Sequence, residues 1–305
     1  VGFQPDWLWG KVRSAVNDNW IYDSIRGGYR LVTDSNAAQV DYSAEWGQFD
    51  SDGWTFGNNA NSQNASAATF IGRCWRANGG SLTTNNVGTQ TSYTQTDPSG
   101  TFSIVKYAGT GAAMTIGHGL SVEPLMTIIK DLDAVVDYPA YTKLIDGSLD
   151  FFLLNTTAAP GGSGFIGPNS SIWNMNSASG YSNTSGRNYI MYNFANTEGY
   201  MKVGTYEGNG DVNGTFVYCG FRPAFIMTKS AGSTSNWQQF DDTRVGYNVD
   251  NNELQANTTA AETTTDMIDI LSNGFKLRIA TDPNVAETYV FLAFAHNPFQ
   301  YATAR

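Results

Sequence analysis

One stretch of the chain occurs three times, and this internal repeat limits the folds that the chain can adopt. In each copy a proline precedes a lysine by six residues, and the apolar segment between them reads as a strand. The proline–lysine pairs are Pro5 and Lys11, Pro124 and Lys130, and Pro223 and Lys229. A fixed order of features at regular intervals predicts one structural unit repeated along the chain.

The same order of features continues downstream in every copy. A turn of small residues follows the lysine, in segments 34–38 (DSNAA), 155–159 (NTTAA) and 257–261 (NTTAA). A last predicted strand ends each copy, in segments 69–75 (TFIGRCW), 188–194 (NYIMYNF) and 288–294 (TYVFLAF). Because order and spacing hold in all three copies, chance is a poor explanation for the likeness.

Copies one and three share an Asp-x-x-Arg pair, in YDSIRGGY (22–29) and FDDTRVGY (240–247). We interpret Asp23 with Arg26, and Asp241 with Arg244, as ion pairs that clasp a turn between two strands. The alternative is that the arginines hydrogen-bond a ligand carboxylate or a sugar. The clasp is favoured because the pair recurs with the scaffold, and we expect little energy from it since exposed ion pairs contribute little.

Copies one and three also share a turn signal, Asp-Gly in SDGWTF (51–56) and Asn-Gly in SNGFKL (272–277). Such pairs between alternating apolar residues are a strong hairpin signal. If both turns are type I′, Gly53 and Gly274 take positive φ, and alanine at either position is equally costly. The middle copy has lost this turn and the Asp-x-x-Arg pair.

The composition suits short strands joined by polar turns. Charged residues make up only 14% of the chain, aromatic residues 13% and hydrophobic residues 41%, so a core can form although helix formers are scarce. Each complete copy has the length and turn spacing of a β-sandwich, and a propeller is the alternative. We therefore predict an all-β fold of three tandem β-sandwich units, lectin-like or jelly-roll-like: copy one (1–80), a linker (81–100), copy two (101–197, divergent) and copy three (198–305).

Copies two and three are introduced by a further predicted strand that copy one lacks. These lead-in strands lie in FSIVKYAGTG (102–111) and YMKVGTYEGNG (200–210). We expect copy one, without its lead-in strand, to have an unpaired sheet edge beside residues 5–11, as in the C-terminal piece of a longer polypeptide. An unpaired apolar edge invites pairing with another chain, and we expect a neighbouring subunit of a homotrimer to cover it.

Motifs for catalysis, metal binding or cofactor binding are missing from the sequence. The net charge is −10 with isolated Lys and Arg residues, which disfavours a nucleic-acid partner, and no apolar run is long enough for insertion into a membrane. Cys74 and Cys219 are expected to be free and buried. His118 and His296 are predicted to be turn or capping residues, because neither stands at metal-ligand spacing. We expect neither an enzyme nor a cofactor.

Trp46 is the one candidate ligand-binding residue. It stands in AEWGQF, and no large apolar residue matches it in the other copies. An aromatic ring outside the repeated core pattern can serve as a sugar-stacking platform or as an interface residue.

Several phrases of the sequence carry a likeness to a known family. They are GFQPDWLWGKVRS, YDSIRGGY, FDSDGWTFG, FIGRCWRA, IGHGL, NTTAA, VYCGFRPAFIMTK, LSNGFKL and AFAHNPFQYATAR. With these phrases the chain resembles a repeat family of bacteriophage tail-fibre and other virion proteins, prominent in phages of marine bacteria and cyanobacteria. The likeness covers nearly the whole chain, and the middle copy departs from it where the clasp and the Asn-Gly turn are lost.

The resemblance implies a non-enzymatic virion structural protein. Its expected role is that of a tail-fibre or tail-spike module that recognises a host-surface glycan, with other virion proteins and further copies of itself as partners. It would be assembled in the host cytoplasm and carried on the extracellular particle. The alternatives are a purely architectural capsid-decoration or baseplate protein and a polysaccharide depolymerase.

Overall fold

The computed structural model describes residues 1–57, 63–244, 248 and 252–296. Strands make up 45% of the described residues, in several antiparallel sheets, and these residues form no helix. The predicted all-β fold class is confirmed. In these residues there is accordingly no helix with the length and hydrophobicity to cross a membrane.

Copy one builds a five-stranded sheet and a separate hairpin. The sheet has the order β4-β3-β2-β1-β7, with the bounds Val40–Asp41, Tyr29–Val32, Asn19–Asp23, Trp7–Val12 and Phe70–Trp75. The hairpin pairs β5 (Trp46–Asp50) with β6 (Gly53–Phe56). Leu8 and Trp20 of the sheet share one buried cluster with Trp46 of the hairpin, so the hairpin lies against this sheet.

Copy two builds an eight-stranded sheet and a three-stranded sheet. The larger has the order β15-β14-β13-β12-β18-β10-β9-β8, with the bounds Gly161–Gly162, Asp150–Leu153, Pro139–Thr142, Met126–Asp131, Asn188–Phe194, Phe102–Ala108, Ser92–Thr96 and Thr83–Asn85. The smaller has the order β11-β17-β16, with the bounds Met114–Gly117, Ile172–Met175 and Gly167–Pro168. Ile116 and Trp173 of the smaller sheet cluster with Tyr141 and Met191 of the larger.

Segment 81–100, which we expected to be a linker, supplies β8 and β9 to this sheet. The segment is rich in threonine, and β-branched residues suit a strand at least as well as a loop. The expectation of a structureless connection is corrected: the chain passes from copy one into the sheet of copy two without an intervening linker.

Copy three builds a five-stranded sheet and a three-stranded sheet. The larger has the order β19-β26-β21-β22-β23, with the bounds Met201–Glu207, Thr288–Ala295, Pro223–Ser230, Gln238–Asp241 and Leu254–Gln255. The smaller has the order β20-β25-β24, with the bounds Phe216–Tyr218, Gly274–Leu277 and Ile268–Leu271. Phe275 of the smaller sheet packs edge-on against Phe291 of the larger, with ring centroids 5.5 Å apart.

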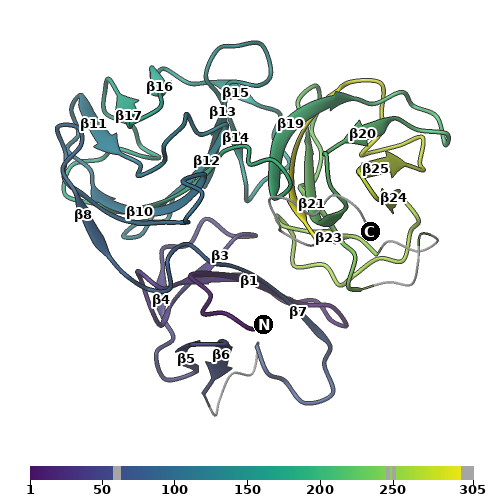
Figure 1. The fold of residues 1–305 in the computed structure, drawn as a ribbon, viewed down its shortest axis with the longest axis horizontal. Helices are drawn as coiled ribbons and strands as arrows, with labels where there is room; N and C mark the ends of the chain where they lie inside the picture. The colour runs from purple at the N-terminus through teal and green to yellow at the C-terminus, as the bar shows by residue number, and fades with distance from the viewer. Residues whose placement is uncertain (58–62, 245–247, 249–251, 297–305) are drawn as a thin grey trace.

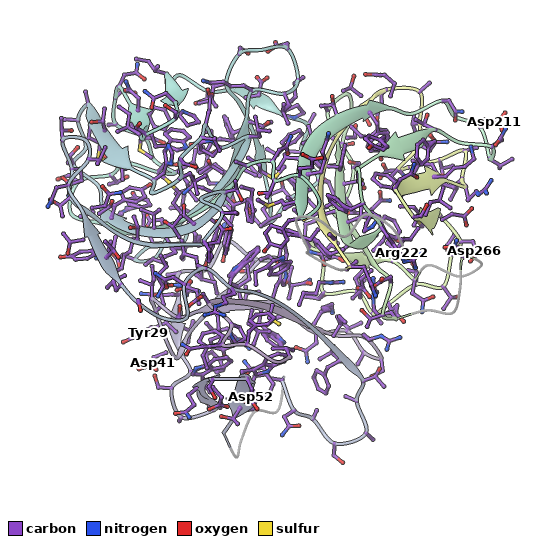
Figure 2. All side chains as sticks on the ribbon, in the orientation of Figure 1. Tyr29, Asp41, Asp52, Asp211, Arg222 and Asp266 are labelled. Atoms are coloured by element: carbon purple, nitrogen blue, oxygen red, sulfur yellow. The ribbon has the colours of Figure 1, made fainter. Side chains whose placement is uncertain are left out.

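The three large sheets surround one common centre (Figure 1), and side chains fill the space between them (Figure 2). One buried cluster contains residues of all three copies, among them Trp7, Phe102 and Phe225. Successive residues of a strand face opposite sides, so in β26 Leu292 faces this central core while Phe291 faces the smaller sheet of its own copy. Burial on both faces explains why β26 is an almost uninterrupted apolar run.

The three lysines of the repeat join each copy to another. Each is fully buried and hydrogen-bonds both to its own copy and to the small-residue turn of a different copy. The contacts between copies run from Lys11 Nζ to the Thr259 carbonyl (3.0 Å), from Lys130 Nζ to the Asn36 carbonyl (2.9 Å) and from Lys229 Nζ to the Thr157 carbonyl (3.0 Å). The three acceptors occupy the same position of their turns, so the contacts close a ring: copy one to three, three to two, and two to one.

The unpaired sheet edge of copy one lies at a different strand from the one that we expected. β1 pairs with β2 on one side and with β7 on the other, so the prediction of an open edge at residues 5–11 is wrong. The reason is that the lead-in strands β10 and β19 pair with the last strands of their copies, β18 and β26. The strand of copy one that lacks this neighbour is therefore β7, which ends its sheet.

The predicted hairpins are present, but their glycines do not make the turns. Gly53 pairs with Asp50 and Gly274 pairs with Leu271, each as the first residue of a strand, and neither has positive φ. The condition for equal alanine penalties, a positive φ at both glycines, is therefore not met, because the two turn residues precede the glycine. The surroundings of the two glycines also differ: a Cβ would lie 2.0 Å from the Val217 carbonyl oxygen at Gly274, but 3.9 Å from the nearest atom at Gly53.

Candidate functional site

Both predicted clasps form ion pairs, and both are buried. Arg26 Nε lies 2.6 Å from Asp23 Oδ2, and Arg244 Nε lies 2.7 Å from Asp241 Oδ2, with every side chain at most 3% exposed. In each case the arginine also reaches a backbone carbonyl of its own copy. The assumption of exposed, weak pairs is therefore corrected, because the turn that carries them faces the interior where the copies meet.

Each clasp carboxylate also binds a residue of another copy. Tyr192 of β18 donates to Asp23 Oδ2 (2.6 Å), and Arg73 of β7 donates to Asp241 Oδ2 (2.9 Å) and to Gln239 Oε1 (2.9 Å). Arg73 and Tyr192 stand at the same position of their copies, two residues before the terminal aromatic of segments 69–75 and 188–194. The clasps therefore join copy one to copy two and copy three to copy one.

The joint between copies three and one is a network of charges. Arg244 Nη1 donates to Glu262 (2.8 Å), and Arg13 of copy one binds both oxygens of Glu262 at 2.9 Å. Burial lowers the pKa of Arg73 to about 10, although Asp241 opposes the shift. Burial alone would raise the pKa of Asp241, but Arg73 and Arg244 outweigh it and hold that pKa below its usual value.

At the third joint, between copies two and three, the positions equivalent to the clasp and to Arg73 carry no charged side chain. The positions equivalent to Asp241 and Arg244 are Thr142 and Ile145 in copy two, and the position equivalent to Arg73 is Leu292 in copy three. Leu292 belongs to the central core, and Ile145 packs against that core. The loss of the Asp-x-x-Arg pair in the middle copy is thus matched by an apolar residue in its neighbour.

The sequence analysis did not predict that Arg73 and Tyr192 bind another copy, although the sequence contains a signal for Arg73. Arg73 is the one charged residue in a segment whose counterparts, 188–194 and 288–294, contain none. A charge at a position that is uncharged in the other copies predicts a compensating partner, since buried charges are paired.

Trp46 lies in the core of copy one. Its side chain is 5% exposed, and its ring is stacked on Tyr22 with centroids 4.0 Å apart. Phe49 and Phe56 pack edge-on against it. The proposal of a sugar-stacking platform at Trp46 is therefore corrected: the hairpin β5–β6 folds over the sheet and covers the ring.

A surface hollow of about 480 Å³ in copy three offers the exposed aromatic rings that Trp46 does not. It lies between β19 and β20, and Phe216, Tyr218, Lys202 and Glu207 contribute to its lining. Phe216 is 43% exposed and Tyr218 is 61% exposed. Residues two apart on one strand share a face, so the two aromatic side chains stand side by side.

The polar groups of this hollow are arranged to leave one cation available. Glu207 Oε1 accepts a hydrogen bond from Thr288 (2.6 Å), which fixes the carboxylate. Lys202 makes no hydrogen bond or ion pair with any described residue. A fixed acceptor, a free donor and two aromatic faces are the groups that bind a sugar ring.

A second hollow, of about 430 Å³, lies along β7 between copies one and three. Its lining includes Gly72, Cys74 and Trp75 of β7 and, across from them, Phe225 and Phe294 of copy three. Trp75 packs against Phe294 with centroids 5.1 Å apart. The hollow is thus an apolar groove beside the open edge of a sheet.

The two histidines make local polar contacts, His296 Nδ1 with the Asp242 carboxylate, and the two cysteines are free. His118 is buried, its Nδ1 accepts from the Leu120 N–H (3.1 Å), its Nε2 lies 2.9 Å from the Asn169 carbonyl, and burial lowers its pKa. Cys219 is buried, Cys74 is half-buried, and neither is in a disulfide. No group of three or more His, Cys, Asp or Glu residues within the described ranges could hold a metal ion.

One family model matches residues 1–298 of the chain, and it is described as a domain of unknown function, DUF7483. Neither a curated protein nor a solved structure matches the chain. A function for the chain therefore has to be argued from its own geometry.

Proposed function

The chain belongs to the DUF7483 family of domains of unknown function, and on that premise we propose that it is a non-enzymatic structural module of a bacteriophage particle, of the tail-fibre or tail-spike kind, that binds a host-surface glycan. The resemblance of its repeated phrases to virion proteins supports a role in the phage particle. The hollow between β19 and β20 supports the binding of a glycan.

We infer that the architecture is three tandem β-sandwich units closed into a ring. In copies two and three a large sheet shares a buried cluster with its own smaller sheet, and in copy one it shares a cluster with the hairpin β5–β6. The lysine contacts and clasps hold the three units to one another. Units joined to one another by buried contacts suit a particle protein that must persist outside a cell.

The observation that carries glycan binding is the exposed pair Phe216 and Tyr218 beside Lys202 and Glu207. Few of the large aromatic side chains of the described residues are exposed. The faces of exposed aromatic rings stack on the apolar faces of sugars. The charged groups beside them would fix the orientation of the sugar through its hydroxyl or carboxylate groups.

A glycan array tests this proposal, followed by affinity measurements on the hits. Tyr218→Ala should weaken binding about tenfold or more, which corresponds to about 1.4 kcal/mol. Tyr29→Ala is the matched control, because Tyr29 is also an exposed strand tyrosine (40%) but lies on β3 in copy one, away from β19 and β20 (Figure 1). Equal losses in the two variants would place the ligand elsewhere.

Further assays on the glycans found by the array distinguish glycan recognition from the two alternative functions. Release of reducing ends from a bound polysaccharide would make the chain a depolymerase, and silence across the array would favour an architectural capsid-decoration or baseplate protein. The homotrimer and the virion location rest on the resemblance alone, since fibres and spikes are commonly threefold assemblies. A monomer in sedimentation equilibrium would overturn the trimer.

A further inference from the structure

The open edge of β7 differs from the equivalent strands of the other two copies. β18 lies between β12 and β10, and β26 lies between β21 and β19. β7 has β1 on one side and, among the described residues, no strand on the other. None of the described residues therefore fills this one position of the threefold arrangement.

The edge of β7 has a backbone N–H at the position where the other two copies donate a hydrogen bond to the start of the lead-in segment. The N–H of Ala195, the residue after β18, donates to the Thr101 carbonyl at 2.8 Å, and the N–H of Ala295 in β26 donates to the Tyr200 carbonyl at 2.8 Å. The equivalent residue of copy one is Arg76. Its N–H has no such acceptor within residues 1–57, 63–244, 248 and 252–296. Since alternate residues of a strand point their backbone groups to the same side, Cys74 and Gly72 present theirs to the same open edge.

The groove described above lies where the missing strand would pass. In copy two, the lead-in strand β10 begins at Phe102, which packs on Trp7 of the neighbouring copy with ring centroids 5.9 Å apart. The residue of copy three equivalent to Trp7 is Phe225, two residues after the repeat proline. Phe225 lines the groove opposite β7, so the wall that a lead-in strand would contact is in place.

The two strands that fill this position elsewhere share a sequence pattern. β10 contains FSIVKY and β19 contains MKVGTY, which agree as an apolar residue, any residue, Ile or Val, any two residues, and Tyr. The tyrosine is stacked on a tyrosine of the last strand in both copies, Tyr107 on Tyr189 at 5.1 Å and Tyr206 on Tyr289 at 5.0 Å. The equivalent residue of β7 is Phe70, which keeps an aromatic partner in place.

We propose that the groove along β7 binds one extended strand with the pattern apolar-x-Ile/Val-x-x-Tyr, supplied by a neighbouring polypeptide. The strand would run antiparallel to β7, with its first apolar residue opposite Trp75 and its tyrosine opposite Phe70, as in the registers of β10 and β19. Its main-chain groups would pair with those of Gly72, Cys74 and Arg76, and its apolar side chains would continue the central core. A folded second copy is not the donor, because its own β10 and β19 are already paired within the chain. The proposal does not depend on glycan binding.

Synthetic peptides with the sequences of residues 100–109 and 199–208 test this proposal by fluorescence anisotropy and by thermal shift of the chain. Both peptides should bind and raise the melting temperature, and a scrambled peptide of the same composition should do neither. Equal binding of the scrambled peptide, or no binding by either lead-in peptide, would overturn the proposal.

Backbone methylation of the peptide gives a control that leaves the protein unchanged. In β10 the odd-numbered residues pair their backbone groups with β18, as the bonds at Thr101 and Gly109 indicate. N-methylation at the position of Val105 should therefore weaken binding at least tenfold, whereas N-methylation at the position of Ile104 should change it little. The reverse order would contradict the proposed register.

Variants of β7 complete the test. Cys74→Pro removes an edge N–H that faces away from β1, and proline is tolerated at such positions of edge strands, so peptide binding should fall at least tenfold. Cys74→Ala, which keeps the N–H, should bind as the wild type does. A dimer of the chain that the peptides dissociate in sedimentation velocity would assign the groove to a second copy and overturn the proposed donor.

Discussion

Two joints of the ring place different chemistry at equivalent positions. Where copy three meets copy one, Asp241 accepts from Arg73 and Arg244 in the interior. Where copy two meets copy three, the equivalent residues are Thr142, Ile145 and Leu292. Buried ion pairs and apolar contacts of similar volume can be equally stable, so closure of the ring requires complementary partners and no particular chemistry. The charged joint adds a penalty for wrong partners, because an unmatched charge would be left buried.

The largest effect is expected when the charged joint loses its shared carboxylate. Asp241→Asn leaves the buried Arg73 without its carboxylate partner and leaves Arg244 with Glu262 alone, and breaking a buried ion pair costs about 3–5 kcal/mol. Asp23→Asn should cost less, because it strands one guanidinium, that of Arg26, beside the neutral Tyr192. Urea unfolding of the two variants measures the difference. Equal losses would mean that Arg73 contributes nothing to the joint.

An ion pair introduced at the apolar joint tests whether the two joints have equivalent geometry. Leu292→Arg alone should cost about 3 kcal/mol or more, since it buries a cation that lacks a carboxylate. Thr142→Asp in the same chain should recover at least about 1 kcal/mol of the summed losses, as directly interacting residues do. A double-mutant cycle gives this coupling energy. Strict additivity would show that the two positions do not meet as their counterparts do.

The two repeated glycines distinguish the copies through their surroundings. Gly274→Ala should cost roughly 1–3 kcal/mol, because the new Cβ would collide with the Val217 carbonyl oxygen and overpacking has costs of this size. Gly53→Ala should change the free energy of unfolding by less than about 0.5 kcal/mol, since the space around it is open. Thermal unfolding of both variants is the measurement, and similar losses would contradict the asymmetry.

The smallest effect is a pH dependence common to all three joints. Burial lowers the pKa of Lys11, Lys130 and Lys229 to about 8, against the opposing pull of nearby carboxylates. In the unfolded chain a lysine holds its proton up to about pH 10.4. Between these values the unfolded state binds more protons, so the free energy of unfolding rises with pH.

Methionine variants isolate this contribution from that of other groups. Lys130→Met should gain less stability than the wild type between pH 8 and 10, by an amount on the order of 1 kcal/mol. Denaturant titrations at the two pH values measure it. An identical pH slope in the variant would mean that the pKa of Lys130 is the same in the folded and unfolded chain.

The sequence was sufficient to predict contacts within a copy and insufficient for contacts between copies. Asp23 with Arg26 could be predicted because both residues lie on one turn. The carbonyl partner of Lys11 could not, since Thr259 comes from another copy, 248 residues away along the chain. The lysines were recognised as repeated but not as buried, because a lone lysine is ordinarily a surface residue.

The open edge shows a second limit of the repeat comparison. The open edge was expected beside residues 5–11, which follow the lead-in position in sequence order, whereas the strand that ends the sheet is β7. Strand order within a sheet depends on which edges remain free once the other strands have paired, and a linear repeat does not contain that information. Trp46 shows a third limit: the absence of a counterpart in other copies indicates a local difference, which here is the hairpin that covers the ring.

The ring closure described above also has a consequence in time. The contacts that join copy one to copy three, such as Arg13 with Glu262, connect residues 249 positions apart. At a synthesis rate of about 5–20 residues per second, copy one must wait on the order of 10–50 s on the ribosome before its partner exists. During that interval Trp7 and Trp9 have no completed core to enter. The nascent first copy is therefore a stage at which this chain is exposed to aggregation and to chaperones, and the synthesis of copy three ends that exposure.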